Sequence, residues 1–338
     1  MFRSVYILFC LLLGLSACTH RFDGVEDNSP VGNFETLWRT IDEKYCYLDD
    51  KEVNWQLVHD TILPRVKQMD GSDYLALFDC MAGMLNLLED GHVNLYSDFD
   101  VSRCESWYAG YPENFDWDLL EDCYLSSYRR AGEAYYTTIA SGEIGYVYCP
   151  SFENPVTPNN MAYMLRSFRE CKGMIVDVRQ NGGGSLEYAE QLAATFFSET
   201  RVVGSWQHKS GPGHSDFSPL RVRKIDKDDM PSKWLRPVVV LCNRHTYSAA
   251  NYFVSAMRYA DNSCILGGWS GGGGGIPMSY ELPNGWVVRF SSIRMVDKEG
   301  VSIEGGVKPH LFVNQRSDDC DDLIESAVAL ILKAYETK

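Results

Sequence analysis

Ser248 lies at a place in the sequence where a serine could act as a nucleophile. It follows the apolar run "PVVVL" and precedes the helix-forming run "AANYF". A serine at a strand-to-helix junction can expose its hydroxyl beside the next backbone N–H, as in a nucleophile elbow. The same position suits a helix N-cap, where the hydroxyl accepts a backbone N–H. The residues around Ser248 are compatible with both roles.

A glycine-rich turn, "NGGG" at 181–184, is the second feature that could support chemistry. It follows the strand-like "GMIVDVR" and precedes a helix-like run that starts near Ser185. Backbone N–H groups at such a turn favour an anion, and a developing oxyanion is one. A purely structural tight turn would need the same glycines. Phosphate binding is disfavoured, because the turn matches neither the P-loop nor the dinucleotide-binding glycine pattern.

A catalytic serine needs a base, and three of the seven histidines could supply one. His92 follows a glycine at the start of a strand-like segment. His245 lies three residues before Ser248, and His310 lies near an expected strand end. These observations do not choose among the three. The sequence contains no H-E-x-x-H motif and no close His/Cys pairs, so we expect no metal and no cofactor.

The pattern of elements predicts how these residues are positioned. Apolar residues at helical spacing over 33–88 predict a small bundle of helices, and we assign an N-terminal helical subdomain to 33–97. Residues 98–140 show no clear periodicity and are expected to be irregular with short strands. Strands then alternate with helices, which predicts an α/β layered core over 98–338. Within this core, "SYELPNGWVVRFSSIRMV" is expected to form a hairpin that turns at "PNG".

Five segments, in this order, resemble the C-terminal processing (tail-specific) protease and tricorn-core family of serine peptidases. The chain also resembles the lipoprotein members of that family from gut Bacteroidetes. The resemblance covers roughly residues 34–315 and implies a ClpP/crotonase-like layered catalytic core. The segments are "LLEDGHVNLY", "GYVYCPSFEN", "GMIVDVRQNGGGSLEYAEQLA", "PVVVLCNRHTYSAANYF" and "IEGGVKPHLFV".

The resemblance implies roles for the first group of candidate residues. Ser248 matches the nucleophile. The N–H groups of Ala249 and of Gly182 or Gly183 match the oxyanion hole. The processing-protease branch places a lysine base soon after the serine, but here that region reads "GGWSGGGGGIP" and the next lysine, Lys298, lies far downstream. A Ser–Lys dyad is therefore not expected.

The tricorn-core branch implies a different base. It uses a histidine at the position of His92, aided by a glutamate that matches Glu304. In that branch a serine precedes the histidine and links it to the glutamate, whereas here the neighbour is Gly91. Asp90 is therefore a rival for orienting His92.

Further departures concern the surroundings of the site. Asn251 stands where family members often carry a glutamate, and His310 stands in place of an aspartate. Residues 98–140 are too few for the PDZ domain of the processing proteases. We therefore expect the cleft itself to select the substrate, with the glycine run near 271–275 acting as a mobile flap.

The N-terminus predicts export and anchoring. Arg3 precedes a short apolar stretch that is typical of a signal peptide, assigned here to residues 1–17. The ending "LSAC" resembles a bacterial lipobox, which would place lipid on Cys18, with 18–32 as a tether. This predicts a lipoprotein of the cell envelope, facing the periplasm or held at the outer membrane. Nine of the eleven cysteines remain beyond Cys18, in no assigned pairing.

Composition bounds the partners. A formal charge of −15 argues against nucleic acid, which needs a basic face. The expected function is a serine-type endopeptidase of the envelope, which acts on peptide or protein substrates through a Ser–His acyl-enzyme; the oligomeric state stays open. The alternative is a catalytically degenerate peptide- or ligand-binding lipoprotein, since the family also resembles a retinoid-binding protein. A third reading, an isomerase or hydratase, rests on analogy to the crotonase fold.

Overall fold

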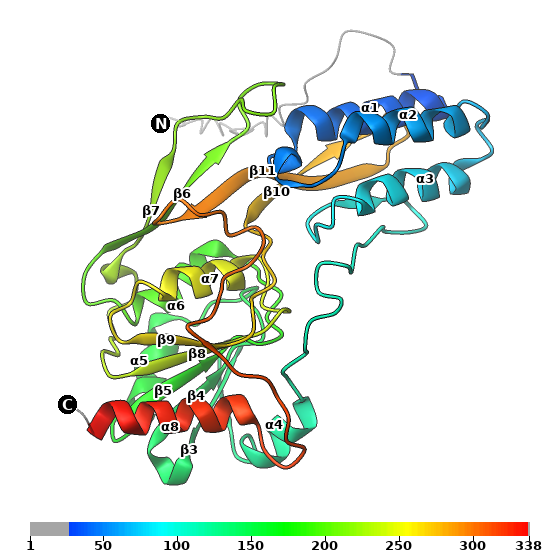
Figure 1. The fold of residues 1–338 in the computed structure, drawn as a ribbon. Coiled ribbons are helices and arrows are strands. Elements are labelled where there is room, and N and C mark those ends of the chain that lie inside the picture. The colour runs from blue at the N-terminus through cyan, green and yellow to red at the C-terminus, as the bar shows by residue number, and fades with distance from the viewer. Residues whose placement is uncertain (1–26, 337–338) are drawn as a thin grey trace, which may run out of the picture.

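A seven-stranded sheet forms the centre of one of the two parts of the molecule (Figure 1). The computed structural model describes residues 27–336. The strand order is β12-β9-β8-β5-β4-β3-β2, with parallel pairing from β12 to β4 and antiparallel pairing at β3 and β2. The strands are β2 (Arg129–Ala131), β3 (Ala134–Ile139), β4 (Ile144–Tyr148), β5 (Gly173–Asp177), β8 (Val238–Cys242), β9 (Ser263–Gly267) and β12 (Leu311–Phe312).

Helices cover both faces of this sheet, as the colours of Figure 1 show. The central strands β4, β5 and β8 are buried along their whole length, which explains their continuous apolar runs. This layering confirms the α/β class. One face carries α5 (Pro158–Ser167), α6 (Leu186–Ala194) and α7 (Ala249–Met257); the other carries α4 (Trp117–Cys123) and α8 (Asp322–Glu336).

The other part of the molecule contains the predicted helices and a second, five-stranded sheet. Its helices are α1 (Pro30–Lys44), α2 (Trp55–Val66) and α3 (Tyr74–Asn86). Its strands are β1 (Asn94–Tyr96), β6 (Arg201–His208), β7 (Arg221–Ile225), β10 (Gly275–Glu281) and β11 (Val287–Asp297). The described residues also form three short 3-10 helices: η1 (Leu48–Asp50), η2 (Ala140–Gly142) and η3 (Lys227–Asp229).

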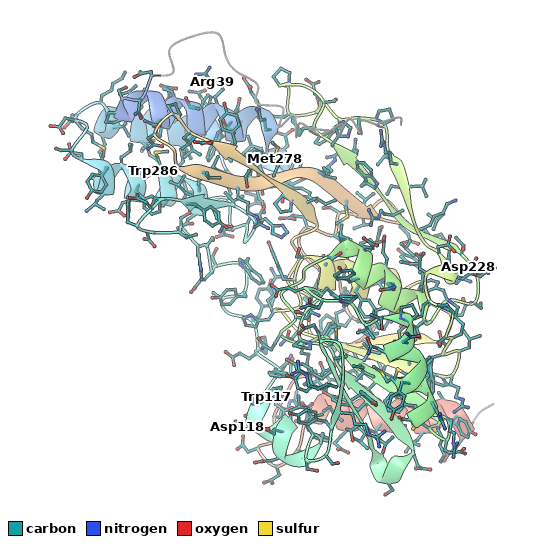
Figure 2. All side chains as sticks on the ribbon, turned by 180° about the vertical axis from the view of Figure 1, so that it is seen from behind. Arg39, Trp117, Asp118, Asp228, Met278 and Trp286 are labelled. Carbon is teal, nitrogen blue, oxygen red and sulfur yellow. The ribbon has the colours of Figure 1, made fainter. Side chains whose placement is uncertain are left out.

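The expected hairpin is present, and it joins the two parts of the chain. β10 and β11 pair antiparallel, and Gly285 takes a φ of 85° at their turn. Trp286 and Phe290 of this hairpin are buried in one hydrophobic cluster with α1–α3 (Figure 2). The hydrophobic cluster of the helices therefore extends beyond the predicted boundary at residue 97, because it includes side chains of the β10–β11 hairpin.

Strand β11 is the long strand of the five-stranded sheet, and its Met295 also packs in the hydrophobic cluster on the seven-stranded sheet. Its first residues pair with β1, just after the predicted His92, and its last residues pair with β6. A residue in the middle of β11 therefore lies between the stretch that pairs with β1 and the stretch that pairs with β6.

The structure can be compared with several further predictions from the sequence. Residues 98–140 include α4, a helix that the sequence analysis did not predict. Within residues 27–336, no helix is long and apolar enough to cross a membrane. All nine cysteines of the described chain are free thiols. The signal peptide and Cys18 lie outside the described residues.

Candidate active site

Ser248 has the backbone geometry of a nucleophile elbow, is partly buried, and lacks the hydrogen bond of a helix cap. It precedes α7 with φ 55° and ψ −121°, a region that residues other than glycine rarely adopt, and its side chain makes no capping hydrogen bond. Its Oγ lies 3.1 Å from Nε2 of His92. The strained backbone therefore turns the hydroxyl away from the helix and toward an imidazole.

His92 is held at the start of β1 by the turn before it. Its backbone N–H donates to Oδ1 of Asp90 at 2.7 Å, and its ring meets that of Tyr247 edge-on at 4.9 Å between centroids. The residue is 4% exposed. Burial lowers the pKa of His92 to about 4, against the opposing influence of Asp90, and Arg289 adds to the lowering. The imidazole is therefore neutral at neutral pH and able to accept a proton.

The second nitrogen of His92 faces a serine that the sequence analysis missed. Nδ1 lies 3.5 Å from Oγ of Ser291, in the middle of β11. Nothing in the local sequence "RFSSIR" marks this serine, since its position depends on how distant strands pair. The structure thus brings His92 to Ser248 on one side and to Ser291 on the other.

Asp90 is a buried centre of hydrogen bonding beside His92. Besides the backbone of His92, it accepts the hydroxyls of Tyr45 at 2.7 Å and Tyr247 at 3.1 Å. Burial opposes its ionisation, but His92, Lys51 and these hydrogen bonds outweigh burial and hold the pKa of Asp90 below its usual range. Asp90 is therefore a fixed negative charge that orients the backbone of His92 and the Tyr247 ring against it.

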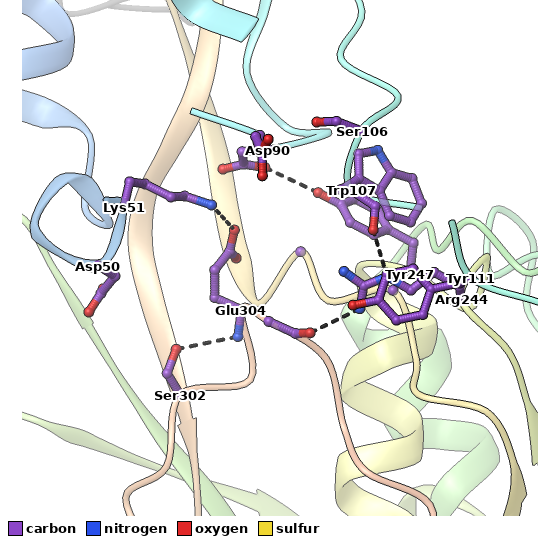
Figure 3. Close-up of a pocket in the computed structure, with 14 residues that line it drawn as sticks. Asp50, Lys51, Asp90, Ser106, Trp107, Tyr111, Arg244, Tyr247, Ser302 and Glu304 are labelled. Atoms are coloured by element: carbon purple, nitrogen blue, oxygen red, sulfur yellow. Dashed lines mark hydrogen bonds and ion pairs between the residues drawn. The ribbon is translucent and has the colours of Figure 1, made fainter. Parts of the chain in front are cut away.

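Glu304, which the resemblance pairs with His92, contacts a different residue. Its Oε1 lies 3.4 Å from Nζ of Lys51, while Oε2 is buried without a hydrogen-bond partner in the described chain (Figure 3). Burial and the charge of Asp90 raise the pKa of Glu304 to about 8, although Lys51 opposes the rise. The described contacts of Glu304 do not include His92, and its carboxyl is mostly protonated at neutral pH.

The Glu304→Gln variant should reveal this raised pKa as a pH-dependent change in stability. The folded protein holds the Glu304 proton up to about pH 8, whereas the unfolded chain releases it near the ordinary value of 4.5. Stability of the wild type therefore falls as pH rises through this window. The variant lacks this loss. The difference in free energy of unfolding, variant minus wild type, should therefore rise by on the order of 1–3 kcal/mol between about pH 5 and pH 9.

Urea unfolding at several pH values measures this difference. Glu153→Gln, a change at an exposed glutamate, is the matched control and should track the wild type. Parallel stability curves for Glu304→Gln and wild type would show that the carboxyl ionises normally in the folded protein.

The glycine turn is packed directly against Ser248. A Cβ on Gly183 would lie 2.7 Å from Cβ of Ser248, so only glycine fits there. The N–H of Gly183 donates to Oδ1 of Asn181 at 2.9 Å. The resemblance left Gly182 and Gly183 open for the oxyanion hole. The N–H of Gly183 is engaged, whereas the described residues show no acceptor for the N–H groups of Gly182 and Ala249.

The glycine run that follows is not a mobile flap. Residues 271–275 are buried, and the carbonyl of Gly272 accepts the backbone N–H of Ser248 at 2.9 Å. A Cβ on Gly272 would lie 1.9 Å from the carbonyl oxygen of Glu304. The glycines permit close backbone packing, which fixes the loop of Glu304 beside the start of α7.

Two cavities lie beside this arrangement, and the mutually tilted rings of Trp107 and Tyr247 line both of them. One, of about 440 Å³, is lined by Gly182, Gln180 and His245 among others. The other, of about 380 Å³, is lined by Lys51, Arg244 and Glu304 among others and is drawn in Figure 3. Gly182, whose N–H has no acceptor among the described residues, lines the first cavity, while Ser248 and His92 are in the lining of neither.

The other histidines considered as bases occupy different places. His245 packs against Tyr108 with the rings tilted and 4.8 Å between centroids, in the wall of the 440 Å³ cavity. His310 accepts the backbone N–H of Ile265 through Nδ1 at 2.9 Å, where β12 meets β9. Neither has a contact with Ser248 among the described residues. The residues from 27 to 336 also hold no group of three or more potential ligands suited to a metal ion.

A hydroxyl on a strained strand-to-helix turn, beside a buried neutral imidazole and unengaged backbone N–H groups, is the arrangement found in serine hydrolases. Comparison with known proteins agrees with this class. The profile of Peptidase family S41 matches residues 143–313, and that of the Tricorn protease C1 domain matches residues 27–85. The chain belongs to peptidase family S41.

Individual relatives extend the comparison. A solved structure of a candidate peptidase from Parabacteroides merdae is 42% identical, with a TM-score of 0.85 over 90% of this chain and 98% of that one. Mature CPAF shares the fold at 12% identity, with a TM-score of 0.65 over 91% of this chain and 97% of its own. The carboxy-terminal processing protease CtpA of Bacillus subtilis is 25% identical over 53% of this chain, a match that spans 37% of CtpA.

Proposed function

We propose that this protein is a serine endopeptidase that cleaves peptide bonds through a Ser–His acyl-enzyme. The observation that carries the proposal is the 3.1 Å contact between Ser248 Oγ and His92 Nε2, made by a serine in strained backbone geometry. The membership of family S41, and relatives named as processing proteases, support peptides as the substrate class.

The first half of the reaction follows from this geometry. His92 Nε2 takes the Ser248 proton as Oγ attacks the peptide carbonyl carbon, and the carbonyl oxygen becomes an oxyanion. The N–H groups of Gly182 and Ala249 are the donors that can meet this charge. Each such donor contributes about 3 kcal/mol to transition-state stabilisation in serine proteases.

The second half regenerates the enzyme. His92 donates the proton to the leaving amine, the C–N bond breaks, and Ser248 keeps the acyl group as an ester. Water then enters, gives its proton to His92 and attacks the ester carbon. The Ser248 oxygen leaves and recovers its proton from His92, which releases the acid product.

Labelling with a fluorophosphonate and hydrolysis of a quenched fluorescent peptide library test the proposal together. The purified wild type should form a covalent adduct at Ser248 and should cleave peptides at internal bonds. Covalent labelling without cleavage of any peptide would point to a different acyl substrate. A protein that binds peptides but is not labelled would be a carrier, the alternative function that the changes at Gly91 and Asn251 suggested.

We also propose that the protein is a lipoprotein of the cell envelope, on the basis of the lipobox-like "LSAC". Full-length protein expressed in a bacterium that processes lipoproteins should incorporate an alkyne fatty acid and sediment with membranes. Cys18→Ala should lose both properties, because lipid is attached through the Cys18 sulfur, whereas Cys10→Ala, within the same leader, should keep them. Incorporation of lipid by Cys18→Ala would refute the assignment.

A further inference from the structure

We propose that Ser291 is the positioning residue for His92 and that its hydroxyl oxygen accepts a hydrogen bond from Nδ1–H during catalysis. This inference rests on the proposed function, since it deepens the role of the same pair. It gives Ser291 the task that a carboxylate performs in most Ser–His hydrolases. The carboxylate expected from the resemblance, Glu304, is not placed to perform it.

The protonation of the two ring nitrogens of His92 during the reaction requires a hydrogen-bond acceptor at Nδ1. A neutral imidazole carries one N–H, so Nε2 can accept the Ser248 proton only if the hydrogen is on Nδ1. After the transfer, both nitrogens are protonated and both must donate. Among the described residues, the side-chain oxygen within hydrogen-bond range of Nδ1 is Oγ of Ser291, at 3.5 Å. A hydroxyl oxygen has lone pairs for this bond in both stages of the reaction.

The alternatives for this role are engaged elsewhere. Asp90 uses its two oxygens for the backbone of His92 and for the hydroxyls of Tyr45 and Tyr247. Glu304 lies against Lys51, and its raised pKa leaves it mostly neutral. Asp90 therefore supplies negative charge near the imidazolium without touching Nδ1, and Arg289 opposes that effect.

The fold holds Ser291 rigidly in this position. The residue is fully buried in the middle of β11, and its carbonyl accepts the backbone N–H of Cys46 at 2.9 Å. Across the sheet, Gly275 leaves the space that the hydroxyl occupies: a Cβ there would lie 2.4 Å from Oγ of Ser291. A β-strand fixed on both sides is a more precise support for a catalytic side chain than a loop.

Nitrogen NMR of ¹⁵N-histidine-labelled protein tests the inference without relying on activity. The spectrum reports which ring nitrogen carries the proton, and the His92 signals are identified by their loss in His92→Ala. Wild type near neutral pH should show Nδ1 protonated and Nε2 bare. Ser291→Ala should shift His92 toward a mixture of the two tautomers, while Glu304→Gln should leave the tautomer as in wild type.

The rate of fluorophosphonate labelling supplies the second measurement. Ser291→Ala should be labelled about 10- to 100-fold more slowly, the range typical of losing a group that orients another functional side chain. Ser292→Ala is the matched control, because this neighbouring serine of β11 is only partly buried and its side chain has no hydrogen bond to His92 among the described residues; its labelling rate should equal that of wild type.

The two measurements together decide whether Ser291 positions His92. Protonation of Nε2 in the wild type would overturn the inference, and so would an unchanged tautomer and rate in Ser291→Ala. A tautomer shift in Glu304→Gln but not in Ser291→Ala would transfer the role to Glu304. If the wild type is not labelled at all, the proposed function fails, and the tautomer measurement still tests the contact between Ser291 and His92.

Discussion

Replacing Ser248 with alanine is expected to abolish covalent labelling and to lower kcat/KM for peptide hydrolysis by on the order of 10⁴–10⁶, the cost of removing a serine-protease nucleophile. Folding should be nearly unaffected, within about 0.5 kcal/mol, because the hydroxyl caps no helix and alanine retains the same backbone strain. Thermal unfolding of the variant therefore separates loss of chemistry from loss of structure.

A matched serine makes this test specific. Ser255 lies in the same helix, α7, and is buried, so Ser255→Ala should retain labelling. An adduct that forms on Ser248→Ala as readily as on wild type would place the nucleophile elsewhere and would remove the basis of the proposed mechanism.

Replacing His92 with alanine is expected to slow acylation of Ser248 by about 10²–10⁴, the usual contribution of a general base. The wild-type enzyme should also show an unusual pH profile. Because burial lowers the pKa of His92 to about 4, its labelling rate should stay nearly constant as pH falls from about 8 to 5 and should drop only as pH approaches that pKa.

Labelling rates across pH check both parts of this expectation. The His92→Ala variant should lack the acid limb, since it has no imidazole to protonate. His310→Ala, which changes a histidine at the β12–β9 contact, is the control and should keep it. A wild-type midpoint near the ordinary histidine value of 6.5 would contradict a buried, neutral base.

The positions of the local motifs could be predicted from the sequence because each depends on neighbouring residues. The apolar run before Ser248 and the helix after it are both present, and the glycines after β5 form the expected turn. What spacing could not decide was the base. His92 and Ser248 are 156 positions apart and meet through tertiary packing, so the resemblance to the tricorn core, and no periodicity, pointed to His92.

The residues that were missed share a physical reason. Ser291 and Lys51 reach the site because β11 pairs with β1 and because η1 packs near the Glu304 loop, and neither fact has a local signature. The glycine run was misread for the opposite reason. Its composition is typical of a flexible segment, but here the absence of side chains lets Gly272 lie against the backbone of Glu304. Helix α4 had one sequence signal, the N-cap residue Asp116. The helix was not predicted because it is too short to show a helical repeat of apolar residues.

Two departures from the family pattern have structural roles in this chain. Asn251 donates from Nδ2 to the carbonyl of Ile303 at 2.9 Å and accepts the hydroxyl of Ser270 at 2.6 Å. His310 bonds the backbone of β9. Asn251 therefore ties together the loops of Ser270 and Ile303, and His310 supports the contact between β12 and β9, so both are weak grounds for regarding the protein as catalytically degenerate.

The dependence of the site on β11 affects when activity can arise during synthesis. A ribosome makes the imidazole early, the hydroxyl 156 positions later, and the strand that supports both later still. A nascent or prematurely terminated polypeptide that ends before residue 287 therefore contains the reactive pair without the strand that aligns it. Such fragments are expected to be inert, so proteolytic activity should not arise during synthesis before β11 has been made and has paired with β1.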